Sequence, residues 1–412
     1  MSGTLLVSGA KQLLTLRGLA GPRRGAALQE LGIIHDGALL IDHGRIVEVG
    51  LTRRVENLAQ IRPCEEIDAT GRIVIPGFVD CHTHLVRGVP ARDVSLGDTG
   101  DAEAALAGHA LRNVSAKRLE SRARVYVNAM ARHGTTTLEA KSGYGLDERS
   151  EVKILRAQAR LDGEPLDIAS TFVTARTLPA GHGDSAAYLT WICRELLPAI
   201  RRRTFARFAA LGCGYGVFDP EQSRYFLKVA RELGFQLKID AAGFPAEEAV
   251  RLATEEGVTS VDGLEHVGAA DAELLAQSKA VAVLLAGDAF WQSRGGGGCG
   301  RLLIDAGAAV ALGTNFDPDT DSTCSMAAAV AMACAHLGMR PEEAISAATF
   351  NAACTVGAGN VAGSLEVGKW ADFIVLNTAD YRDIPHRFGM NLVNCTVKRG
   401  VVIYQEGRVG RP

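Results

Sequence analysis

Two histidines separated by a single residue, His82 and His84, have the types and spacing that metal chemistry needs. They follow an apolar, β-branched run over residues 73–79, which is typical of a buried parallel strand. Side chains two apart on a strand point to the same side, so both imidazoles would face one point. The pair therefore predicts part of a divalent-metal site at the carboxyl end of a strand. The alternative is two unrelated polar residues in a loop, which the short motif alone does not exclude.

Strand-like and helical runs alternate through the middle of the chain, as in βα units. The strand-like runs lie at 73–84, 135–141, 167–175, 205–213, 235–241, 260–267, 280–286 and 309–315. Helical runs between them include 116–131, 148–161, 220–233, 245–256 and 271–277. Eight such strands predict an α/β fold, the TIM (β/α)8 barrel, whose strand ends carry the active-site residues. Short strands before and after this region include a hairpin with its turn at His43 and Gly44.

Composition excludes several other classes of protein. The chain of 412 residues has a net charge of -3, which gives no basic surface for nucleic acid. No apolar run reaches the length of a membrane span, and no targeting segment is visible. The nine cysteines have no regular spacing, which suits reduced thiols. We therefore expect a cytoplasmic protein that acts on a small molecule, without a nucleic-acid or membrane partner.

Two stretches resemble a known family. Residues 73–84, Ile-Val-Ile-Pro-Gly-Phe-Val-Asp-Cys-His-Thr-His, resemble the first barrel strand of the amidohydrolase superfamily. Residues 139–147, Glu-Ala-Lys-Ser-Gly-Tyr-Gly-Leu-Asp, are similar to the signature of imidazolonepropionases, which open the imidazolone ring in histidine breakdown. The resemblance implies a barrel over 73–360, a small β-sandwich built from 1–72 and 361–412, one zinc or iron ion, and a homodimer.

The resemblance also implies which residues hold the metal. The family uses the two histidines after strand one, a histidine after strand five, often one after strand six, and an aspartate after strand eight. Here Asp240 stands at the strand-five position, so the expected ligands are His82, His84 and Asp240. Gly263 replaces the strand-six histidine, and His266 can substitute only if that strand has ended or bulged.

The strand-eight position bears on proton transfer. In the family an aspartate there takes the proton of the water and passes it to the leaving nitrogen, whereas this chain has Asn315. An amide cannot accept and return a proton as a carboxylate does. Asp317 could stand in if the loop curls back, and the alternative is a local turn contact before Pro318. Asn315, Asp317 and His266 are thus the candidate catalytic residues.

Substrate contacts follow from the same comparison. Tyr144 matches the family tyrosine, and Arg92 matches the carboxylate-binding arginine with a one-residue shift, while Arg87 is its rival. Either guanidinium could bind a propionate bidentately, or lie solvated at the surface. Arg176 stands where the family has a histidine, and Gly243 where it has an acidic or amide side chain. With Asp317, these residues form the expected substrate-binding set.

Two hypotheses about function remain open. The first is an imidazolonepropionase-like hydrolase that cleaves a C–N bond in a cyclic amide or amidine with metal-activated water. The second is a catalytically inactive homologue with a degenerate metal site, acting as a binding or regulatory protein. An inward cation at Arg176 would repel a metal and favours the second hypothesis. Metal binding is accordingly expected to be weak or absent.

Overall fold

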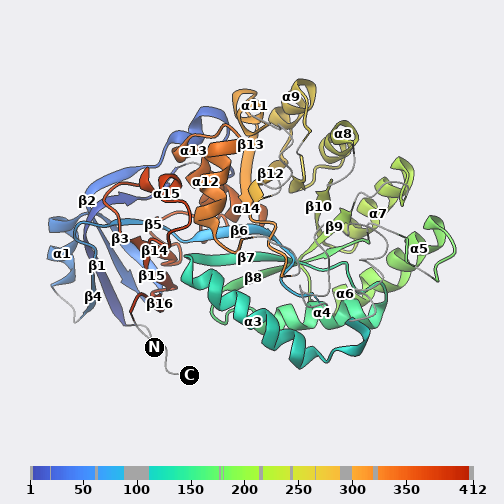
Figure 1. Ribbon diagram of the computed structural model, residues 1–412, viewed down its shortest axis with the longest axis horizontal. Helices are drawn as coiled ribbons and strands as arrows, with labels where there is room; N and C mark the ends of the chain where they lie inside the picture. Colours follow the sequence, from blue (N-terminus) through green and yellow to red (C-terminus); the bar gives the residue numbers. More distant parts are fainter. Residues whose placement is uncertain are drawn as a thin grey trace.

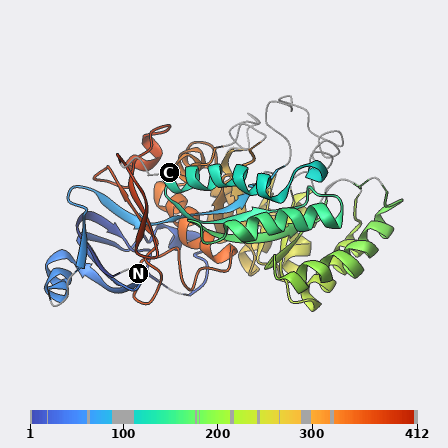
Figure 2. The same cartoon turned by 90° about the horizontal axis from the view of Figure 1, so that it is seen from below.

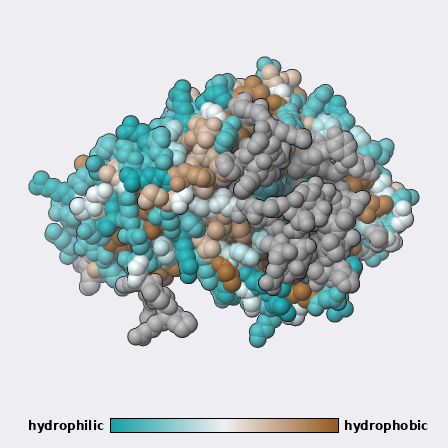
Figure 3. All heavy atoms as spheres, in the orientation of Figure 1, coloured by the Kyte–Doolittle hydropathy of each residue, from teal (hydrophilic) through white to brown (hydrophobic). Residues whose placement is uncertain are grey.

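The computed structural model describes residues 3–18, 20–60, 64–87, 111–175, 178–179, 181–212, 217–241, 245–264, 266–287, 299–318 and 323–407. Two sheets organise them, a barrel formed by the middle of the chain and a separate sheet built from its two ends, side by side in Figure 1. Within these residues no helix has the length and apolar character needed to cross a membrane. The face seen in Figure 3 is mainly hydrophilic over the terminal sheet.

The barrel consists of parallel strands that neighbour each other in chain order. They are β6 (Phe78–Thr83), β7 (Thr135–Lys141), β8 (Asp167–Val173), β9 (Phe208–Gly212), β10 (Gln236–Asp240), β11 (Ser260–Asp262), β12 (Val281–Leu285) and β13 (Ala309–Gly313). Most of their residues are buried, because helices cover the outside and side chains fill the inside. The last strand meets the first where Asn315 N–H donates to the His82 carbonyl at 3.1 Å and His84 N–H to the Phe316 carbonyl at 2.7 Å. The predicted TIM barrel is confirmed.

Helices form the outer layer around the strands (Figures 1 and 2). The main ones are α3 (Ala116–Arg132), α4 (Glu148–Leu161), α5 (Ser185–Trp191), α6 (Leu197–Arg203), α7 (Pro220–Glu232), α8 (Ala246–Glu256), α9 (Ala269–Gln277), α11 (Cys299–Asp305), α12 (Met326–His336) and α13 (Pro341–Ser346). Side-chain caps begin several of them, such as Asp147 on α4 and Asp219 on α7. Helix α3 buries Leu119, Ala123 and Val127, a stripe at helical spacing that faces the barrel.

The two ends of the chain build the terminal sheet, in the order β16-β15-β14-β5-β1-β2-β3 with β4 paired to β1. Its strands are β1 (Thr4–Leu14), β2 (Ile33–Asp42), β3 (Arg45–Leu51), β4 (Cys64–Asp68), β5 (Ile73–Pro76), β14 (Phe373–Leu376), β15 (Val393–Lys398) and β16 (Val401–Gln405). The β2–β3 turn is His43-Gly44, as expected, with positive φ at both residues, which suits a two-residue hairpin. Where the resemblance implied a small β-sandwich, the two ends of the chain form one sheet, separate from the barrel, with its own cluster of buried apolar side chains.

The run expected as one barrel strand over residues 73–84 is split at Gly77, and the expectation of a single strand was wrong. Strand β5 pairs with β1 and β14 in the terminal sheet, and only β6 belongs to the barrel. At the crossing, Gly77 N–H donates to the Asp372 carbonyl at 3.0 Å, and Phe78 N–H to that of Gly134 at 3.0 Å. One apolar run therefore serves two sheets. The predicted domain boundary at residues 72 and 73 stays a prediction, although β5 lies on the barrel side of it and pairs outside the barrel.

Gly77 is the position where this crossing tolerates no side chain, because an added Cβ would overlap the Thr136 side chain. We expect Gly77→Ala to lower the free energy of unfolding by about 1–3 kcal/mol through overpacking. Urea unfolding measures the change. The control is Gly50→Ala, whose new Cβ would find its nearest neighbour at 3.7 Å. Equal stability of both variants would contradict this account.

Candidate functional site

A run of hydrogen-bonded side chains crosses the carboxyl ends of the strands. His82 Nδ1 lies 2.9 Å from Asp262 Oδ2, His82 Nε2 lies 3.3 Å from His84 Nε2, and His84 Nδ1 lies 2.9 Å from Tyr144 Oη. His82 and Asp262 are fully buried, whereas Tyr144 is partly exposed. Because ionised Asp262 only accepts hydrogen bonds, His82 donates from Nδ1 and keeps the lone pair of Nε2 for a neighbour.

The neighbouring strand end leaves space for His82. A Cβ on Gly313, the last residue of β13, would lie 2.8 Å from the His82 Cβ, so this position requires glycine. Two residues on, Asn315 has a φ of 55°, a left-handed conformation that asparagine and aspartate tolerate better than most residues. The chain thus turns sharply at the position where the family has its aspartate.

A buried ionic cluster lies beneath the histidines. Lys141 Nζ donates to Asp262 Oδ2 at 2.6 Å and lies 3.9 Å from Asp240 Oδ2 and 4.0 Å from Glu139 Oε1. Lys238 Nζ donates to Glu139 Oε2 at 2.5 Å. Burial alone would lower the pKa of Lys141, but the three carboxylates raise it above its usual value. Burial would likewise raise the pKa of Asp262, but Lys141 and His82 lower it, so both groups stay charged.

The two histidines suit a metal ion, but the third expected ligand is engaged elsewhere. Ligand nitrogens about 2.0–2.1 Å from a tetrahedral metal lie about 3.3–3.4 Å apart, close to the 3.3 Å between the two Nε2 atoms. The Asp240 carboxylate is directed to Lys141, at 3.9 Å. Within the described parts of the chain, no group of three or more His, Cys, Asp or Glu residues could hold a metal ion. The spacing of the two histidines is thus compatible with a shared metal ion, and the ligand set of His82, His84 and Asp240 stays a prediction.

An arginine and a tyrosine close the outer end of the run. The Arg87 guanidinium stacks over the Tyr144 ring, 4.1 Å from its centroid. It binds Asp317 with two contacts, Nε to Oδ1 at 3.1 Å and Nη2 to Oδ2 at 3.0 Å. Both side chains are largely buried. Neither expectation for Asp317 foresaw this partner, which lies 230 residues away in the sequence.

The remaining candidate residues lie elsewhere or outside the described residues. Strand β11 ends at Asp262 and Gly263 has a φ of 78°, so His266 follows a turn, where it is exposed. Arg92, Arg176 and Gly243 lie outside the described residues. The sequence interpretation missed the buried partners Glu139, Lys141, Lys238 and Asp262. For Glu139, Lys141 and Lys238 the signal was the i, i+2 spacing of charges (139/141 and 238/240) within strands that are otherwise apolar, which directs them to one side of the strand. Asp262 is a single charge in its strand and lacks that signal.

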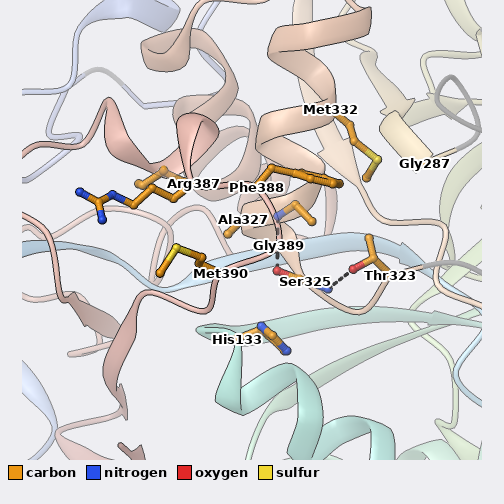
Figure 4. A pocket seen from close by; sticks show the side chains of 12 residues that line it. His133, Gly287, Thr323, Ser325, Ala327, Met332, Arg387, Phe388, Gly389 and Met390 are labelled. Carbon is orange, nitrogen blue, oxygen red and sulfur yellow. Dashed lines mark hydrogen bonds between the residues drawn. The ribbon is translucent and has the colours of Figure 1, made fainter.

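A separate pocket of about 270 Å³ lies between α12, the end of α3 and the segment before β15. Its walls include Met332, Phe388 and Met390, with His133 opposite them (Figure 4). Ser325 N–H donates to the Thr323 hydroxyl at 3.1 Å at its edge. Among the described residues, none of those expected to bind metal or substrate lines this pocket.

Comparisons with known proteins identify the class. The amidohydrolase family model matches residues 65–115 and 105–404, and the chain belongs to that family. Its full-length relatives include the imidazolonepropionase of Symbiobacterium thermophilum, 39% identical over 99% of both chains. The imidazolonepropionase of Bacillus cereus is 38% identical over 99% of this chain and 98% of its own. This chain is therefore imidazolonepropionase-like in sequence.

Solved structures share the fold at lower identity. Escherichia coli guanine deaminase superposes with a TM-score of 0.71 at 17% identity, covering 98% of this chain and 99% of that one. A triazine hydrolase from Arthrobacter aurescens gives a TM-score of 0.74 at 18% identity, covering 98% and 96%. These likenesses support the barrel with its additional sheet.

The buried bond between Lys141 and Asp262 gives a stability prediction. Asp262→Asn would remove the main negative partner of the buried Lys141 ammonium group and the carboxylate that orients His82. We therefore expect the free energy of unfolding to fall by about 3–5 kcal/mol. Urea unfolding measures it. The control is Asp305→Asn, since Asp305 pairs with Arg301 at the surface and its loss should cost less than about 1 kcal/mol. Similar losses in both variants would refute a special role for the buried pair.

Proposed function

We propose that this chain is a hydrolase of the imidazolonepropionase type, which cleaves a C–N bond in a cyclic amide or amidine ring, in histidine breakdown. The observation that carries the proposal is the continuous run Asp262–His82–His84–Tyr144 at the carboxyl ends of the strands. It occurs in a chain similar over its whole length to proteins named imidazolonepropionase. We also propose a cytoplasmic homodimer, on the resemblance to metabolic enzymes alone.

The proposed cofactor is one zinc or iron ion held by His82, His84 and Asp240. The 3.3 Å separation of the two Nε2 atoms and the burial of both rings favour the histidine half. When bound, such an ion lowers the pKa of a coordinated water to about 7. Asp240 would have to turn from Lys141 to complete the site. Because the metal ion and Lys141 would compete for the Asp240 carboxylate, we expect the ion to bind more weakly than in a site whose ligands are neutral or have no competing partner.

The chain's own residues would orient the substrate ring. Tyr144 Oη can donate to or accept from a ring nitrogen or carbonyl, while its hydrogen bond to His84 fixes its position. Proton transfer would require a rearrangement of the residues around the ring. The Asn315 amide cannot carry it, Asp317 would have to leave Arg87, and His266 would have to approach from its exposed turn.

The catalytically inactive homologue remains the second candidate. Asn315 at the expected proton-transfer position favours it, because loss of such a group costs about 10²–10⁴-fold in rate. The retained Tyr144 and histidines would then serve ligand binding. Turnover of a bound ring distinguishes the two candidates.

Metal content tests the proposed cofactor. We expect protein dialysed against a chelator to retain well below one equivalent of zinc or iron, measured by elemental analysis. The double variant Asp240→His, Asn315→Asp should retain more, because it restores a neutral imidazole and a carboxylate at the family's ligand positions. Gly263 is left unchanged, since its positive φ would strain a histidine there. A full equivalent in the wild type would show that the site is not weak.

Turnover tests the activity itself. We expect metal-supplied wild-type protein to consume imidazolonepropionate slowly, followed by loss of the ring absorbance. Asn315→Asp should accelerate the reaction by about 10²–10⁴-fold if it restores proton transfer. His82→Ala serves as the inactive control. Ring binding without any turnover in wild type or Asn315→Asp would favour the inactive homologue.

A further inference from the structure

A buried carboxylate from the next helix holds the loop that carries Tyr144. Glu151, in the first turn of α4, accepts hydrogen bonds from the backbone N–H groups on both sides of the tyrosine. Gly143 N–H donates to its Oε2 at 3.1 Å, and Gly145 N–H donates to its Oε1. Glu151 is only 3% exposed. One buried side chain therefore fixes the backbone immediately before and immediately after Tyr144.

Both residues that flank the tyrosine have to be glycine for this contact. A Cβ on Gly145 would lie 2.4 Å from the backbone nitrogen of Glu151 and 2.8 Å from its Oε1. Gly143 has a φ of 104°, which other residues rarely adopt, and its Cβ would lie 2.9 Å from the Val173 carbonyl oxygen. The close approach of the loop to the helix thus depends on the absence of side chains at both positions.

The position of this loop determines where the tyrosine side chain lies. The Tyr144 hydroxyl is 2.9 Å from His84 Nδ1, and the two rings meet edge to face with their centroids 5.4 Å apart. A tyrosine between two glycines would otherwise have many accessible backbone conformations, because glycine restricts the chain so little. Fixing the backbone in advance lowers the entropy cost of placing the hydroxyl against a bound ring.

The charge of the carboxylate suits this task. Burial raises the pKa of the Glu151 carboxyl, whereas the N–H groups of Gly145 and Gly143 lower it. The loop itself thus favours the ionised form, which makes shorter and stronger hydrogen bonds to N–H groups than a neutral acceptor does. The amino end of α4, where Glu151 lies, also favours a negative charge.

We propose that Glu151 is a positioning residue of this site, which holds Gly143 and Gly145 and thereby keeps the Tyr144 hydroxyl beside His84, where it can contact a bound ring. This inference rests on the proposed ring-opening function and adds to it a residue outside the reacting groups. Glu151 acts through Tyr144 and need not touch the substrate, since both of its oxygens face the backbone of the loop.

Fluorine NMR of protein labelled with meta-fluorotyrosine measures the position of Tyr144 without any ligand, and Tyr144→Phe identifies its signal. We expect the signal to shift or broaden in Glu151→Gln, because an amide offers a single oxygen to the two N–H donors and places an NH2 group against one of them. The matched control is Glu148→Gln, since Glu148 lies on the same helix with a side chain that is 45% exposed, and the signal should not move. An unmoved signal in Glu151→Gln would overturn the inference.

Calorimetric titration with imidazole-4-propionate, a ring that cannot be hydrolysed, tests whether this position matters for binding. We expect Glu151→Gln to weaken binding about 10-fold, the upper range for loss of one hydrogen bond. Combined with Tyr144→Ala, it should cause no further loss, because its effect passes through the tyrosine side chain. Unchanged binding in Glu151→Gln, or an equal further loss in the Tyr144→Ala background, would contradict the proposed role.

Two further outcomes are decided by separate measurements. If Glu151→Gln does not fold, hydrogen exchange of the wild type takes its place. The amides of Gly143 and Gly145 should then exchange slowly, and rapid exchange at both would refute the inference. If the wild type does not bind the ring although the Tyr144 signal responds as expected, the proposed function fails, whereas the positioning of Tyr144 by Glu151 is upheld.

Discussion

One oxygen atom, Oδ2 of Asp262, accepts hydrogen bonds from two groups on which the site depends, Nδ1 of His82 and Nζ of Lys141. The first fixes the tautomer of His82 and the direction of its Nε2. The second keeps the carboxylate ionised at full burial, because an ammonium group 2.6 Å away compensates for the lost hydration. Without the lysine, the same carboxylate would become protonated more readily and accept the imidazole N–H less well.

The barrel supplies this arrangement by bringing three strand ends together. Asp262 ends β11, Lys141 ends β7 and His82 lies near the end of β6, and these residues are far apart along the chain. A charged side chain loses its hydration when it is buried at the interior end of a strand, so each of these residues requires a partner from another strand. The ionic cluster thus ties β6, β7, β10 and β11 together just below the mouth, and gives the outer residues a fixed support.

The fold could be predicted from local patterns because apolar runs and helical periodicity mark each element. The two histidines could likewise be placed from the period of a strand. The division at Gly77 could not be foreseen, since it depends on Thr136 and Asp372, which meet Gly77 only in the folded chain. The Arg87–Asp317 pair was beyond sequence reasoning for the same reason. Local spacing placed Asp317 in a turn, whereas the closure of β13 against β6 brings it to Arg87.

The position of Asp240 sets how readily the histidine half-site can be completed. Its carboxylate lies 3.9 Å from Lys141, beyond hydrogen-bond distance, while Lys141 makes its short contact with Asp262 at 2.6 Å. Turning Asp240 toward the histidines would therefore leave Lys141 with its main partner and with Glu139 nearby. The attraction between Asp240 and Lys141 would weaken, and an attraction over this longer distance is worth much less than a direct buried pair. An ion that recruited Asp240 would therefore have to compete with Lys141, which Asp262 holds in place.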